Sequence, residues 1–280
     1  MKLTVFQTGK VCVSPYLPFG GERSNLLQAI GLTTLPKNRL WLPVFCYLVE
    51  HDNGQRVLID TGWHRSMSPE GKFDWRAQVR SLGSLSLFLV NQGRLPQGEA
   101  IDEQLAAHGI KPEELDYVVL THLDCDHANG LRSVAAAKHL LCSADELRFA
   151  QTSRPRTRYQ AIWWRDTPLQ TFDWNSTDGP AGKSYGLFGD GSVMLINIPG
   201  HSDGQVAVKI TGKEGKFVLL CADGGYAEKS WNEMITSGIS ADKTAQKKSL
   251  EWIKAQSEDP RCLCVLASHD TAVHPKTIEL

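Results

Sequence analysis

Four residues that can bind a metal ion lie within six consecutive positions of the chain. His122, Asp124, Asp126 and His127 directly follow the apolar segment 117–120, which predicts a buried strand. Imidazole and carboxylate groups at this density are typical of a metal site. A short loop cannot direct all four side chains at one ion, but His122 and Asp124 can face one ion while Asp126 and His127 face a neighbour. Two divalent ions about 3.5–4 Å apart are a known arrangement for hydrolysis.

Three further candidate ligands follow predicted strands in the same way. His201, Asp223 and His269 each come directly after an apolar segment, and loops at strand ends are common places for catalytic residues. His269 is preferred to His274 as a ligand because His274 lies further from the strand, beside Pro275.

A layered arrangement of strands and helices would position these residues. Apolar segments bounded by turn residues predict strands over 3–7, 44–50, 56–60, 117–120, 139–142, 193–198, 205–210, 216–222 and 262–267. Helices are predicted over 99–110, 128–137 and 241–256, and after Ser143, where Glu146 completes a capping-box pattern. Because strands occur both in hairpins and in alternation with helices, the fold class is α/β or α+β.

The chain is predicted to form a single domain over 1–280, because no stretch is rich enough in Pro, Gly or Ser to act as a linker. Two segments are expected to be insertions, a helical segment or flap at 62–98 and a polar excursion at 151–191. The apolar run 82–90 within the first is consistent with three roles: lining an acyl-chain pocket, forming a subunit interface, or packing as a helix on the sheet.

Arginine and tryptophan side chains gather around the second insertion. They are Arg148, Arg154, Arg156, Arg158, Arg165, Trp163 and Trp164. Arginines interleaved with aromatic residues can bind nucleic acid or anionic substrates. The chain as a whole is balanced in charge, however, so a solvated loop or a contact in a homodimer is the favoured interpretation.

Composition and charge exclude several classes of protein. The hydrophobic fraction of 41% and the charged fraction of 22% exclude disordered and coiled-coil chains. With 30 basic and 31 acidic side chains, the chain lacks the electrostatic signature of a protein that binds nucleic acid or an anionic membrane. No apolar run approaches the roughly 18 residues of a membrane span, and no secretory signal is recognisable. Seven cysteines in mostly apolar surroundings favour a reducing compartment, so a cytoplasmic protein is expected.

The order of these motifs along the chain resembles the metallo-β-lactamase superfamily. The resemblance rests on Asp60 in LIDTG, the cluster HLDCDH, His201 in PGHSDG, Asp223 in CADGG and His269 in SHD, and it covers residues from about 45 to about 275. It implies a four-layer αββα sandwich with a dinuclear metal site in a groove at one edge. The implied ligands are His122, Asp124 and His201 for the first ion, Asp126, His127 and His269 for the second, and Asp223 as a bridge. Asp60 is the implied structural aspartate that supports the site from behind.

One position departs from the superfamily pattern. Members usually have a histidine where this chain has Asp124. A carboxylate is a harder ligand than imidazole and favours iron or manganese relative to zinc. We therefore expect two divalent metal ions, with zinc favoured and iron or manganese as alternatives.

Within the superfamily, the chain most resembles N-acyl homoserine lactonases. Tyr226 stands three residues after Asp223, and the context VVLTHLDCDHANG is also similar to these enzymes. The resemblance implies an enzyme in which a hydroxide bridging the ions opens the lactone ring of a small-molecule substrate. Tyr226 would polarise the lactone carbonyl, and Asp126 would pass a proton to the leaving alkoxide.

Other functions of the same residues remain open. An ester, thioester or phosphodiester hydrolase would use the same dinuclear site. A di-iron oxidoreductase is suggested by Asp124 but disfavoured, because such proteins usually need a flavin domain for which this chain has no room. A non-catalytic metal-binding module has no need for a two-ion ligand set.

Overall fold

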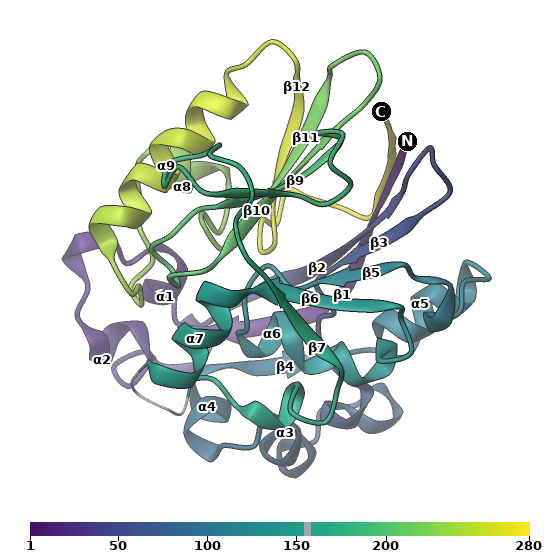
Figure 1. The fold of residues 1–280 in the computed structure, drawn as a ribbon. Coiled ribbons are helices and arrows are strands. Elements are labelled where there is room, and N and C mark those ends of the chain that lie inside the picture. Colours follow the sequence, from purple (N-terminus) through teal and green to yellow (C-terminus); the bar gives the residue numbers. More distant parts are fainter. Residues whose placement is uncertain (154–157) are drawn as a thin grey trace.

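The computed structural model describes residues 1–153 and 158–280. Two β-sheets lie face to face, and helices cover the outer face of each sheet (Figure 1). Within the described residues, the first sheet has eight strands, in the order β13-β1-β2-β3-β5-β6-β7 with β4 paired to β1. The second has five, in the order β12-β11-β10-β9-β8. This is the αββα sandwich expected from the sequence.

Some of the strands are parallel neighbours, so their carboxyl ends lie at the same edge of the sheet. The first sheet contains β1 (Lys2–Val13), β2 (Leu40–Glu50), β3 (Arg56–Ile59), β4 (Gln92–Arg94), β5 (Tyr117–Val119), β6 (His139–Ser143), β7 (Leu169–Phe172) and β13 (Lys276–Glu279). The second contains β8 (Ser184–Gly186), β9 (Val193–Asn197), β10 (Val206–Thr211), β11 (Phe217–Ala222) and β12 (Cys262–Ala267). Because β3 pairs parallel with β5, and β11 with β12, the residues that follow each pair emerge side by side.

The helices form the two outer layers (Figure 1). They are α1 (Tyr16–Phe19), α2 (Leu26–Ala29), α3 (Trp75–Leu82), α4 (Leu85–Val90), α5 (Ile101–Ala107), α6 (Cys125–Ala128), α7 (Ala144–Thr152), α8 (Glu228–Asn232) and α9 (Lys243–Ser257). The last of these begins where the Asp242 carboxylate accepts hydrogen bonds from the backbone of Thr244 and Ala245. It buries Leu250 and Ile253 against the second sheet.

Three layers of buried side chains hold the four layers together. Along β2, Val44, Cys46 and Leu48 face the helices of the first sheet, whereas Phe45 and Tyr47 face the second sheet. This alternation follows from the two-residue period of a strand. Each fully buried aliphatic or aromatic side chain contributes about 1.5–3 kcal/mol, so the sheets are fixed firmly enough to hold loops in defined positions at their edge.

The segment 62–98, expected to be an insertion with a helical segment or flap, contains α3, α4 and β4. Leu82, Leu87 and Phe88 from these helices pack into the core beneath the first sheet. The helix expected over 128–137 is wrong in its bounds. The α-helical turn ends at Ala128, and a 3-10 helix follows over Asn129–Val134, because the Asn129 side chain and the Gly130 backbone bond to other segments of the chain.

The described part of the segment 151–191, expected to be a polar excursion, contains regular elements and buried side chains. It contributes β7 and β8, and Trp163 is fully buried, with its indole N–H donating to the backbone oxygen of Ser81. The interpretation as a solvated loop or dimer contact is therefore wrong for Trp163 and Trp164. Arg148 and Arg165 are largely exposed and pair with neighbouring aspartates, as expected for solvated side chains, although Arg148 lies on α7 and not in a loop. Arg154 and Arg156 lie outside the described residues.

All seven cysteines are free thiols, as the sequence predicts. In the part of the chain that the structure describes, no helix is long and apolar enough to cross a membrane.

Candidate metal centre

The seven side chains predicted to bind metal lie together at the edge where the strands end. They are His122, Asp124, Asp126, His127, His201, Asp223 and His269. His122 follows β5, Asp223 follows β11 and His269 lies just beyond β12, so residues far apart in the sequence become neighbours. Three triplets among the seven each have one ligand atom per residue within 4.8 Å of one another.

Four of these residues, the His269 group, have the spacing that one ion requires. The group consists of Asp126, His127, Asp223 and His269. His127 Nε2 lies 3.3 Å from Asp223 Oδ1, and His269 Nε2 lies 3.2 Å from the same oxygen and 3.4 Å from Asp126 Oδ2. Ligand atoms that lie about 2.0–2.1 Å from a tetrahedral ion are about 3.3–3.4 Å from one another. The His269 group therefore fits one divalent ion.

Hydrogen bonds behind the histidine rings leave their inner nitrogens free. His127 Nδ1 donates to Asp60 Oδ2 at 2.7 Å, and His269 Nδ1 donates to the Pro43 carbonyl at 2.7 Å. Among the described residues, their buried Nε2 atoms and Asp223 Oδ1 have no hydrogen-bond partner. Buried polar atoms are nearly always paired, and metal-bound histidines usually donate their other N–H in this way. The unpaired atoms therefore indicate a place for a cation.

Asp60 lies behind the ligands, where the superfamily resemblance placed its structural aspartate. Its carboxylate is buried and accepts from the backbone N–H and the hydroxyl of Thr121, both at 2.8 Å. Because the hydroxyl proton points at Asp60, the Thr121 oxygen accepts from His122 Nδ1 at 3.0 Å. Asp60 itself has φ of 59°, a left-handed conformation that Asp tolerates better than most residues. This strain is maintained by the same bonds that orient His122 and His127.

Glu146 joins the loops that follow β5 and β9. One carboxylate oxygen accepts from the Leu123 backbone at 2.9 Å, and the other accepts from the Ser202 hydroxyl at 2.6 Å. Burial raises the pKa of the Glu146 carboxyl. The capping box predicted here is half correct, because Ser143 does cap α7, but the Glu146 side chain turns to the metal loops instead of its own helix.

Arg158 reaches into the other half of the centre. Its Nε donates to Asp124 Oδ1 at 2.8 Å, and its Nη2 donates to Asp124 Oδ2 at 2.7 Å. Nη2 also lies 2.9 Å from His201 Nε2, and Nη1 donates to the His201 backbone oxygen at 3.1 Å. The placement of Arg158 in a solvated loop or dimer contact is therefore wrong, because only 16% of its side chain is exposed.

The His122–Asp124–His201 triplet, the His201 group, has a spacing that suits an ion less well. His201 Nε2 and Asp124 Oδ2 are 2.8 Å apart, a hydrogen-bond distance, whereas His122 Nε2 lies 3.6 Å from Asp124 Oδ2. Asp223 Oδ2 lies 3.9 Å from His122 Nε2 and 3.7 Å from His201 Nε2. The Arg158 guanidinium competes for the same lone pairs, and it has no acceptor atom to offer an ion.

The two halves differ in electrostatic character. Burial opposes protonation of His127, but the Asp60 and Asp223 carboxylates outweigh it and raise the pKa of His127 well above its usual range. In contrast, burial together with the Arg158 guanidinium lowers the pKa of His201 to about 4. The surroundings of His127 therefore favour an added positive charge, whereas Arg158 already supplies one beside His201.

A cavity of about 550 Å³ opens onto the centre. The centre contributes Asp124, Asp126, Arg158, His201, Asp223 and His269, together with Tyr226. The walls are apolar and come mainly from the N-terminal segment, through Leu17 and Ile30, and from α4, through Leu87, Leu89 and Val90. An apolar cavity with a few convergent polar groups at one end is typical of a small-molecule site.

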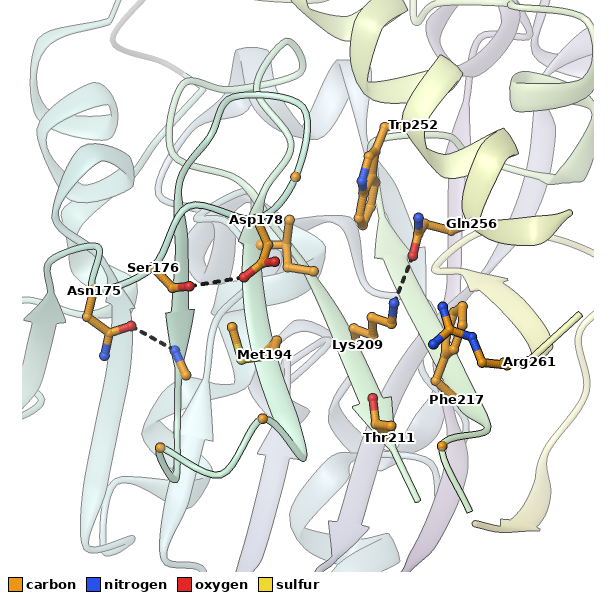
Figure 2. A pocket seen from close by; sticks show the side chains of 16 residues that line it. Asn175, Ser176, Asp178, Met194, Lys209, Thr211, Phe217, Trp252, Gln256 and Arg261 are labelled. Atoms are coloured by element: carbon orange, nitrogen blue, oxygen red, sulfur yellow. Dashed lines mark hydrogen bonds between the residues drawn. The ribbon is translucent and has the colours of Figure 1, made fainter. Parts of the chain in front are cut away.

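A second cavity, of about 720 Å³, lies on the face of the second sheet beside α9 (Figure 2). Its polar side chains are satisfied by one another: Lys209 donates to Gln256 at 2.9 Å, and Ser176 donates to Asp178 at 3.0 Å. Among the described residues that line it, Asp178 is the one carboxylate, and there is no histidine or cysteine. It lacks the donor set of the cavity above the centre.

Comparison with known families addresses the fold that carries these ligand candidates. The family model described as the metallo-β-lactamase superfamily matches residues 39–264. The chain belongs to this superfamily. Its fold and its His/Asp clusters together imply bound divalent metal.

Several relatives within the metallo-β-lactamase superfamily carry a common name. The chain is 27% identical over 213 residues to an N-acyl homoserine lactonase of Bacillus cereus, covering 74% of each chain. It is 23% identical over 236 residues to the N-acyl homoserine lactonase AttM of Rhizobium radiobacter, covering 82% of each. A solved N-acyl homoserine lactone hydrolase, with N-hexanoyl-L-homoserine bound at its catalytic metal centre, matches with a TM-score of 0.72 at 20% identity. That match covers 97% of this chain and 94% of the other.

Proposed function

We propose that this chain is a metal-dependent hydrolase that opens the lactone ring of N-acyl homoserine lactones or related lactones. The observation that carries the proposal is the His269 group, whose unpaired ligand atoms lie at the end of an apolar cavity beside Tyr226. The lactonase names of its relatives support the same substrate class.

The ligand candidates are proposed to form a divalent-metal centre, in which Asp223 faces both the His269 group and the His201 group. When bound, a divalent ion supplies a nucleophile at neutral pH by lowering the pKa of water and polarises a carbonyl oxygen. Zinc is the proposed ion, and iron or manganese are alternatives because carboxylates make up much of the donor set.

Tyr226 is the proposed hydrogen-bond donor to the substrate carbonyl. The ring is buried, is stacked on His269 with centroids 5.2 Å apart, and lines the cavity. Burial and the nearby carboxylates raise the pKa of Tyr226 well above its usual range, so the phenol stays protonated at neutral pH. A protonated phenol can donate a hydrogen bond to the oxygen on which negative charge develops.

Asp126 is the proposed proton carrier for the leaving alkoxide. Its carboxylate lines the cavity, and Oδ2 lies 3.4 Å from His269 Nε2. A carboxylate that reaches both the ligand group and the substrate space can hold a proton and deliver it to the leaving oxygen.

The apolar walls suit an acyl chain. Leu87, Leu89 and Val90 from α4 line the cavity together with Leu17 and Ile30. Each buried methylene of a substrate gains about 0.8 kcal/mol. Of the three roles considered for the run 82–90, lining a substrate pocket and packing on the sheet are both consistent with this arrangement.

Metal removal gives the direct test of this function. We expect zinc-loaded protein to release protons from acyl homoserine lactones or from simple γ- or δ-lactones, and we expect dialysis against a chelator to abolish the release. Zinc should restore it, because the ligand atoms are already oriented in the fold. No release on any lactone, combined with turnover of an ester or phosphodiester, would replace the proposed substrate class.

The Tyr226→Phe variant is expected to lower kcat/KM for lactones by up to about 100-fold, near the lower end of what losing one oxyanion donor costs. Zinc content should not change, because the hydroxyl is not among the ligand atoms. Steady-state kinetics and elemental analysis check the two parts. Tyr185→Phe is the matched control, since Tyr185 lies on β8 of the second sheet and stacks on Phe172 of the first sheet. Unchanged kinetics in Tyr226→Phe would remove the proposed role of the tyrosine.

A cytoplasmic location and a homodimer remain predictions from the sequence. Fractionation of native cells and sedimentation of the purified protein would test them.

A further inference from the structure

We propose that the Arg158 guanidinium takes the place of one of the two metal ions, so that this chain binds a single divalent ion in the His269 group. The inference rests on one part of the proposed function, the binding of a divalent metal ion near Asp223. It does not depend on which substrate is hydrolysed. It replaces the expectation of two bound ions.

The first observation is that Arg158 already holds the ligand atoms of the His201 group. Nη2 lies 2.7 Å from Asp124 Oδ2 and 2.9 Å from His201 Nε2, the two atoms that an ion in this group would have to share. An ion about 2.0–2.1 Å from both atoms would lie against a group that is always protonated and never donates a lone pair. The two cations exclude each other by sterics and by charge.

The second observation is that Asp124 and Arg158 match each other. The carboxylate accepts two parallel bonds from one guanidinium, at 2.8 and 2.7 Å, which is the strong bidentate geometry. The histidine usual at this position offers one ring nitrogen to that side and no charge, so it could not form this pair. The departure at Asp124 is therefore explained by Arg158 without invoking a different metal.

The third observation is the charge balance of the centre. Three carboxylates face it, from Asp124, Asp126 and Asp223, while Asp60 lies behind His127. One divalent ion and one guanidinium together carry three positive charges, which balance those carboxylates. A second ion would add two positive charges beside Arg158 in a buried site, where such repulsion is weakly screened.

The pairing of His201 points the same way. Among the described residues, the Nε2 atoms of His127 and His269 in the His269 group are buried without hydrogen-bond partners, and so is His122 Nε2 in the His201 group. His201 Nε2 instead has two polar neighbours, Arg158 and Asp124. Arg158 thus provides, as part of the chain, the positive charge that a second ion would otherwise supply beside the substrate cavity.

Metal stoichiometry tests the proposal. Protein loaded with excess zinc and desalted should contain one zinc per chain by elemental analysis. The Arg158→Met variant, which keeps the volume but removes the charge, should contain two, and Arg158→Lys should stay at one. Arg148→Met is the matched control, because Arg148 is exposed on α7 and pairs with Asp145. Two zinc ions in the unmodified chain, or one in Arg158→Met, would overturn the proposal.

A second pair of variants decides the case if Arg158→Met does not fold. Asp124→Asn should keep its one zinc, whereas His269→Ala should lose it. Loss of zinc from Asp124→Asn would place the ion in the His201 group and overturn the proposal. Absence of zinc from the unmodified chain would overturn both this inference and the metal-dependent function. One bound zinc without turnover of any lactone would leave this inference standing and remove only the lactonase assignment.

Discussion

The Asp223→Asn variant is expected to lose zinc and lactone hydrolysis together. Asp223 presents Oδ1 to His127 and His269 and Oδ2 to the His201 group. An amide keeps one oxygen and replaces the other with a donor that cannot bind a cation. We expect kcat/KM to fall by more than the roughly 10- to 100-fold that losing an outer partner of a ligand costs. Competition with a chromogenic chelator measures the accompanying fall in zinc affinity.

The fold should survive this change, because the Asp223 backbone is held separately. When the Gln205 amide is oriented to satisfy both neighbours, its oxygen accepts from the backbone N–H groups of Asp223 and Gly224 at 2.8 and 2.7 Å. Asp259→Asn is the matched control, since Asp259 pairs with Arg261 after α9. An Asp223→Asn protein with full zinc content and normal turnover would contradict the assignment of Asp223 as a ligand.

The ligand candidates that the fold brings together could be selected from the sequence because several of them stand next to a strong local signal. His122, Asp223 and His269 lie just beyond apolar strands, and such strands are recognised from short-range pattern alone. The pairing of those strands then brings their ends to one edge. This can be predicted without knowing the individual side-chain contacts. The αββα layers follow from the same alternation of strands and helices.

Arg158 and Glu146 could not be assigned in this way. Arg158 meets Asp124 across 34 positions of sequence, from a segment with no regular period, so nothing local distinguishes it from its exposed neighbours. Glu146 belongs to a capping-box pattern that is partly correct, since the Ser143 hydroxyl caps the helix. The Glu146 carboxylate, however, accepts hydrogen bonds from Leu123 and Ser202 in other loops instead of from the backbone N–H of Ser143. In both cases, the deciding interaction is made between loops that only the finished fold brings together.

The Asp60→Asn variant is expected to weaken zinc binding about 10- to 100-fold without touching a ligand atom. The Asp60 carboxylate makes His127 Nδ1 the donor, which keeps Nε2 free for an ion. An amide in its place can offer an N–H to Nδ1, and the ring then carries its proton on Nε2. Three donors lose a charged acceptor, so the free energy of unfolding should also fall by about 1–3 kcal/mol. Chelator competition and urea denaturation measure the two effects.

Asp116→Asn is the matched control for Asp60→Asn. It separates the loss of zinc affinity from the loss of stability that follows when any carboxylate at a strand end is removed. Asp116 likewise accepts a backbone N–H, from Arg56 at 2.8 Å, but its other partner is the exposed Lys138. Neither substitution is expected to strain the backbone. At position 60, Asn tolerates the left-handed conformation as well as Asp does. A fall in stability in both variants, with zinc affinity lowered in Asp60→Asn alone, would show that Asp60 acts through the His127 tautomer. Equal zinc affinity in the two variants would reduce Asp60 to a structural role, and the orientation of His127 would then have to come from its packing.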